Sequence, residues 1–227
     1  MKFSSLVPSV IAAAGIAVTA SMMPAEAAMF GFNNIQGGDT FGDSIVNQFS
    51  FDVTDAGSGQ VSFKFNNAGP ASSTITQIYW DDMDGILSSL SLDSSKTSAS
   101  GVNFTIPNNV GNLPQGNNLT PSFDENFEVA RSNGQGGAAN GIDSGEMLGV
   151  LFNGSFDSII AGLNDGSLRV GMHVQRIGTA SQSDAYVNAP GNPTQDVPEP
   201  LTILGSATAL GIGGLLKRQQ SKKNNKA

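Results

Sequence analysis

Two short stretches of alternating apolar and polar residues, joined by a glycine-rich turn, constrain the fold of this chain more than any other feature. The sequences FSFDV over 49–53 and VSFKF over 61–65 place a large apolar side chain at every second position, and DAGSG over 55–59 lies between them. Successive side chains of a β-strand point to opposite faces, so each stretch would bury one aromatic-rich face. The pattern predicts an antiparallel β-hairpin.

Short strands are expected along much of the remaining chain. Alternation or short apolar runs predict further strands at 75–80, 102–106, 127–129, 147–152 and 168–174. In the last of these the apolar residues share one face, whereas Arg169 and His173 fall on the other. Many of the segments between these strands are rich in glycine, asparagine, serine and aspartate, which is typical of turns.

One short helix is predicted just before the last strand. Phe156, Ile159 and Leu163 recur at helical spacing, Ser155 can cap the first turn, and Gly166 can end the last one. Many short strands with a single helix favour an all-β fold. We expect an antiparallel β-sandwich of jelly-roll-like topology.

The region between the two terminal segments carries a strongly acidic net charge. Between Ala28 and Val197 there are five basic and 17 acidic residues, a formal charge near −12. Nucleic-acid binding depends on lysine and arginine neutralising phosphates, so a nucleic-acid partner is not expected. The chain has no cysteine, which excludes thiolate metal sites and a cysteine nucleophile.

The N-terminal segment, residues 1–27, has the pattern of a secretory signal peptide. Lys2 precedes the apolar stretch Val10–Val18, and Ala25 and Ala27 give the small-x-small pattern of a signal peptidase site. The mature chain would then begin one residue later. The alternative is a retained anchor helix.

The C-terminal segment combines three features in a fixed order. Pro198, Glu199 and Pro200 are followed at once by an apolar run of 16 residues at 201–216, and then by a basic end at 217–226. The run is marginally short for a membrane-spanning helix. The basic end would stay on the cytoplasmic side under the positive-inside rule, which places the preceding domain outside. An ordinary single-span anchor is the alternative.

These C-terminal features resemble the PEP-CTERM family of exported bacterial proteins. In addition, residues 156–163, 166–175 and 183–188 resemble segments of cyanobacterial PEP-CTERM ectodomains. The resemblance implies that a membrane-embedded transpeptidase, the exosortase, recognises the tail during export. It also implies an association with exopolysaccharide-producing bacteria, and it assigns no activity to the ectodomain.

Together these features predict four regions. They are a signal peptide at 1–27, a β-sandwich ectodomain at 28–179, a proline- and glycine-rich linker at 180–196 and the sorting tail at 197–227. The expected function is that of an exported cell-surface or extracellular-matrix protein with a structural or adhesive role and a transient membrane association. The alternative is a carbohydrate- or calcium-binding module.

The densest cluster of candidate ligands is acidic. Asp81, Asp82 and Asp84 precede Gly85, and carboxylates before a glycine turn can hold a hard cation such as Ca²⁺. The spacing does not fit an EF-hand loop, so a solvated turn is the alternative. No other cofactor is expected.

No set of residues compels a reaction, and we predict that the chain is not an enzyme. His173 is the only histidine, and no Gly-x-Ser-x-Gly motif accompanies it. A glycosidase-like carboxylate pair would have to come from 124–128. Tyr79 and Trp80 could stack on sugar rings, although a single tryptophan in a β domain is more often part of the core.

Overall fold

The computed structural model describes residues 27–38, 40–132, 139–179 and 182–196, and these form one antiparallel β-sheet with short helices around it. The strands are β1 Ala27–Asn34, β2 Phe49–Gly57, β3 Gln60–Asn67, β4 Thr74–Asp82, β5 Ser88–Asp93, β6 Phe104–Thr105, β7 Phe127–Arg131, β8 Ile142–Asp143, β9 Met147–Asn153, β10 Leu168–Ile177 and β11 Gln182–Asp196. The helices are α1 Thr40–Asp43 and α2 Phe156–Asp165, with 3₁₀ turns η1 Val46–Gln48, η2 Ser94–Lys96 and η3 Gly116–Asn118.

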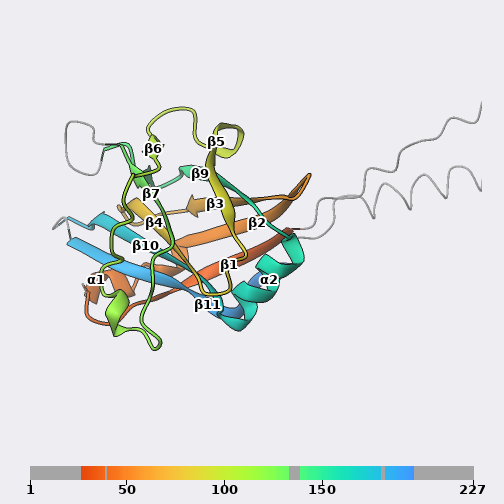
Figure 1. Ribbon diagram of the computed structural model, residues 1–227. Coiled ribbons are helices and arrows are strands. Elements are labelled where there is room, and N and C mark those ends of the chain that lie inside the picture. Colours follow the sequence, from red (N-terminus) through yellow and green to blue (C-terminus); the bar gives the residue numbers. More distant parts are fainter. Residues whose placement is uncertain (1–26, 39, 133–138, 180–181, 197–227) are drawn as a thin grey trace, which may run out of the picture.

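The sheet is continuous and curls into a barrel-like shape (Figure 1). Its strand order is β5-β9-β3-β2-β1-β11-β10-β4-β7-β6, with β8 paired to β4. Contacts across the interior show the curl, because the Phe127 ring of β7 meets the Phe152 ring of β9 at 5.2 Å between centroids. Strands at opposite ends of the sheet order therefore face each other.

The predicted hairpin is confirmed and supplies one wall of the core. Phe51 of β2 lies opposite Phe65 of β3, and their rings stack 5.5 Å apart. Trp80 of β4 closes the core from the other side, with its ring edge-on to Phe65 at 5.6 Å and to Phe152 at 5.0 Å. Edge-to-face aromatic pairs of this kind stabilise a core beyond the area that they bury.

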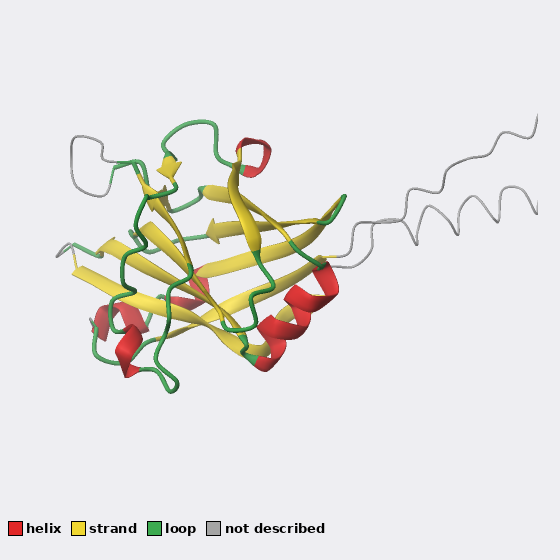
Figure 2. Cartoon of the chain, in the orientation of Figure 1, coloured by secondary structure: helices red, strands yellow, loops and turns green. Residues whose placement is uncertain are grey.

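The predicted helix is also confirmed, with its caps. The Ser155 hydroxyl accepts a hydrogen bond from the Ser158 backbone N–H, and Gly166 ends α2 in the left-handed conformation with φ +86°. Ile159 and Leu163 are buried in the core, and α2 lies against β10 and β11 (Figure 2). The antiparallel all-β class with a short helix is therefore correct.

The expected linker at 180–196 is wrong for residues 182–196, which form β11 between β1 and β10. Proline and glycine in this segment favoured a linker. However, the pairing of β11 with β1 shifts register between Asn188 and Pro193, which lie opposite Phe32 and Phe30. Where the register shifts, a strand tolerates proline, which has no backbone N–H to donate to the neighbouring strand.

Strand β5 was not predicted, and its sequence explains why. The serine-rich segment SSLSLD has only two large apolar residues, Leu90 and Leu92, and no aromatic or β-branched residue. It is nonetheless paired with β9, where Leu92 lies opposite Val150. Pairing with an apolar neighbour, rather than local pattern, makes this segment a strand.

Candidate functional site

Asp81, the first residue of the predicted cation cluster, forms a buried ion pair with Arg169. Its side chain is 1% exposed, and its Oδ2 atom accepts hydrogen bonds from the Arg169 guanidinium, with Nε at 3.0 Å and Nη2 closer. The backbone N–H of Asp124 donates to the same oxygen at 3.1 Å. Asp81 therefore neutralises a buried cation of the chain itself.

The other two carboxylates of the cluster do not join it. Asp82 caps the turn that follows β4, because its two oxygens accept the backbone N–H groups of Ile86 at 3.0 Å and Leu87 at 2.8 Å. Asp84 is exposed at that turn. Among the residues that the structure describes, no group of three or more histidine, cysteine, aspartate or glutamate side chains could hold a metal ion.

A loop over residues 106–126 covers the outer face of β4, β10 and β11, where Leu113 and Phe123 also approach Gly171 of β10. Leu113 and Phe123 from this loop pack with Tyr79, Ala185 and Val187 into a second apolar cluster outside the barrel. The predicted polar face of this part of the sheet is therefore largely covered by protein. We call residues 106–126 the strap.

Carboxylates that were candidates for glycosidase chemistry instead hold the strap. Glu125 accepts the backbone N–H of Leu113 at 2.6 Å, and Glu128 accepts that of Gly111 at 2.6 Å. Hydrogen bonds from backbone N–H groups to carboxylates are among the stronger ones in proteins. Both side chains thus have a structural function that accounts for their position.

Arg169 completes the attachment of the strap. Its Nη1 and Nη2 atoms donate to the carbonyl oxygens of Pro121 at 2.8 Å and Ser122 at 2.7 Å, and its Cζ atom lies 5.2 Å from the centre of the Phe123 ring. The alternation of the strand placed this arginine on the face opposite the apolar residues but did not indicate its role. The available signal was an arginine between the apolar residues Leu168 and Val170 at the start of a predicted strand.

His173 lies at one end of a chain of polar side chains. Its Nδ1 atom is 3.0 Å from the Gln77 Oε1 atom, and Gln77 Nε2 donates to Glu128 Oε1 at 3.0 Å. Burial lowers the pKa of His173, and the nearby charge of Arg131 lowers it further. Among the described residues, no serine or carboxylate hydrogen-bonds directly to the imidazole, so these residues do not form a nucleophile–base pair at this histidine.

Tyr79 and Trp80 do not form a sugar-stacking surface. Both side chains are fully buried, Trp80 in the barrel core and Tyr79 under the strap. Burial, together with the charges of Glu128 and Glu125, raises the pKa of the Tyr79 hydroxyl. The prediction that Trp80 belongs to the core is confirmed.

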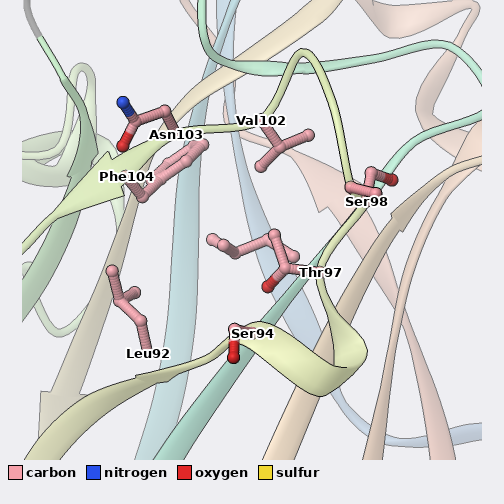
Figure 3. Close-up of a pocket in the computed structure, with 9 residues that line it drawn as sticks. Leu92, Ser94, Thr97, Ser98, Val102, Asn103 and Phe104 are labelled. Atoms are coloured by element: carbon pink, nitrogen blue, oxygen red, sulfur yellow. The ribbon is translucent and has the colours of Figure 1, made fainter.

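A surface pocket of about 270 Å³ lies where the two edge strands of the sheet approach each other. Leu92 of β5, Phe104 of β6 and Leu148 of β9 line it. Figure 3 shows Val102 on the side opposite Thr97. We call this hollow the seam pocket. It was not foreseen from the sequence, because its residues come from separate segments.

The hydroxyl groups beside the seam pocket hold the edge of β9. Ser98 Oγ accepts the Met147 backbone N–H at 2.9 Å, and Thr97 Oγ1 accepts that of Gly149 at 3.0 Å while donating to the Asp93 carbonyl oxygen at 2.7 Å. The segment after β5 thus continues the sheet edge through side chains. The pocket between the edge strands is mainly apolar, with no charged side chain in its lining.

The sorting residues Pro198, Glu199 and Pro200 and the signal-cleavage residue Ala25 lie outside the described part of the chain. Ala27 is the first residue of β1, and its neighbour Ala28 pairs with Asp196, the last residue of β11. The points at which the two terminal segments join the domain are thus cross-strand neighbours. None of the helices in the described ranges has the length and apolar character needed to cross a bilayer.

Comparison with protein-family models, with curated proteins and with solved structures found no match to this chain.

Proposed function

We propose that this chain is an exported cell-surface or extracellular-matrix protein with a structural or adhesive role, sorted by its C-terminal tail. The observation that carries the proposal is the order of Pro198–Glu199–Pro200, the apolar run at 201–216 and the basic end at 217–226. The predicted signal peptide at 1–27 would begin export, and the positive-inside rule would leave the barrel outside the cytoplasmic membrane. Signal peptidase and an exosortase would be its transient partners.

Several properties of the barrel fit an existence outside the cell. Its core is built from aromatic and aliphatic side chains without any disulfide, so folding does not depend on the redox state of the compartment. Its acidic balance favours solubility and mutual repulsion of copies. We further propose that the two facing halves of the curled sheet correspond to the jelly-roll-like β-sandwich that the sequence predicts. No reaction is assigned to the domain itself.

Of the two alternative binding functions, we propose carbohydrate binding ahead of calcium binding. Asp81 and Asp82 already accept hydrogen bonds from the protein, which leaves little of the predicted cation cluster available. A carbohydrate-binding module would use the seam pocket, whose uncharged and mostly apolar lining could accept the C–H face of one sugar residue. Extracellular polysaccharide is the corresponding partner.

The sorting proposal is tested by the intact mass of the protein recovered from the producing cells. Replacing Pro198, Glu199 and Pro200 together with alanine removes the rigid, extended motif but keeps the apolar run. The unchanged protein should begin at Ala28 and end near Pro200, whereas the triple variant should retain its tail in the membrane fraction. Normal tail removal in the variant would refute the sorting role of the motif.

A further inference from the structure

We infer that the barrel is held with one particular end against the membrane while its tail is still attached, and that this end is the one covered by α2. The inference rests on the proposed membrane tail but adds an orientation that the tail alone does not give. Strand β11 carries the tail, and its last residue, Asp196, lies opposite Ala28 at the start of β1. The end of the barrel that contains these two residues is therefore the end nearest the bilayer.

Register identifies the other segments at the same end. Ala27 pairs with Thr54, close to the turn between β2 and β3, and Gln60 after that turn pairs with Asn153 at the end of β9. Helix α2 begins three residues after Asn153 and leads into β10, whose first residue, Leu168, pairs with Asp82. Figure 1 shows α2 beside the start of β1, away from α1.

The segment between Asp196 and Leu201, which we call the tether, is too short for the barrel to place its opposite end on the bilayer. Only five peptide steps separate Asp196 from Leu201, the first residue of the apolar run, so they span at most about 18 Å. A compact domain of the 170 residues from 27 to 196 has a radius of gyration of about 15 Å and hence a diameter of roughly 40 Å. Placing the opposite end on the bilayer would require Asp196 to stand farther away than the tether allows.

The surface of α2 that faces outward is suited to lie near lipid headgroups without entering them. Its exposed residues are Asp157, Ser158, Ala161, Asn164 and Asp165. A membrane-inserting helix presents large apolar residues flanked by lysine or arginine, and this helix presents neither. The barrel should therefore stand on the bilayer through its tail alone, leaving the end with the β8 region directed outward.

The absence of cysteine makes a matched pair of labelling sites possible. Ser158 on α2 and Ser144 after β8 are both exposed serines at opposite ends of the barrel. Each is replaced by cysteine, Ser158→Cys and Ser144→Cys, in the full chain and labelled with one fluorophore. The tail-bearing protein is then placed in phosphatidylcholine nanodiscs that contain an acceptor-labelled lipid headgroup, and energy transfer is measured.

Transfer should be clearly more efficient from position 158 than from position 144. Inserting a long glycine–serine segment between Asp196 and Val197 should reduce that difference, because the tether no longer limits the orientation. Equal transfer in the unmodified tether, or higher transfer from position 144, would overturn the orientation while leaving the sorting proposal intact. Failure of the tail-bearing chain to enter nanodiscs would overturn the membrane tail and this inference together.

Discussion

Replacing Arg169 with methionine should destabilise the domain strongly, although the arginine lies outside the barrel core. The guanidinium bonds to Asp81 and to the carbonyl oxygens of Pro121 and Ser122, and its side chain is 9% exposed. Methionine keeps much of the apolar stem but removes all of these donors. Asp81, which is 1% exposed, would then remain as a buried carboxylate that keeps, within the described part of the chain, the Asp124 N–H as its partner.

The expected loss follows from that uncompensated charge. Breaking a buried ion pair by removing one partner typically costs about 3–5 kcal/mol. Arg176→Met is the matched control on the same strand, because the Arg176 side chain is 53% exposed and its Nη1 atom lies 3.9 Å from Asp143. An exposed pair of this kind contributes at most about 1 kcal/mol. Adding Asp81→Asn to Arg169→Met should recover much of the loss, since the buried charge is gone.

Urea unfolding measures these free energies, and the single tryptophan, Trp80, reports on the core through its fluorescence. Hydrogen exchange of the amides at Leu113 and Asp124 follows the strap separately. In Arg169→Met both amides should lose protection. A change in unfolding free energy no larger than that of Arg176→Met would refute the ion-pair reasoning, as would a double variant that is less stable than Arg169→Met.

Two further changes test the outer face of the sheet. His173 has a pKa lowered by burial, so between its ordinary value of 6.5 and the lower folded value the unfolded chain binds more protons. The free energy of unfolding should reach its full value above that window and fall as the pH drops through it. Urea titrations at several pH values should show no such dependence for His173→Gln. An equal pH dependence in the variant would contradict the assignment. Gly171→Val should loosen the strap by about 1–3 kcal/mol, because a Cβ atom there would lie 2.6 Å from Leu113 Cδ2. Unchanged exchange at Leu113 would show that the strap does not depend on this close approach.

The β2–β3 hairpin and helix α2 could be predicted from the sequence because the pattern of each lies within one short stretch of residues. The alternation around the 55–59 turn predicts the β2–β3 hairpin, and Ser155 and Gly166 mark both ends of α2. Strand β5 carries only two leucines among serines, and β11 contains prolines that argue against a strand. These two segments become strands because neighbouring backbones offer hydrogen bonds to them.

The candidate sites were less predictable because they depend on which side chains meet. Adjacent aspartates at 81 and 82 look like one acidic cluster in the sequence, but neighbouring residues of a strand point to opposite faces. One therefore meets Arg169, 88 positions away, and the other meets the backbone of the next turn. The spacing of carboxylates along the chain says little about whether they share a cation.

The sequence by itself determined the β class, the short helix, the acidic balance and the presence of apolar segments at both ends, since each depends on composition or local periodicity. Only the tertiary structure decided that the strap covers the outer face of β10, that Arg169 neutralises Asp81, and that Ala28 and Asp196 are neighbours. These features join residues far apart in the chain. Long-range strand pairing and side-chain packing bring them together, and neither leaves a local pattern in the sequence.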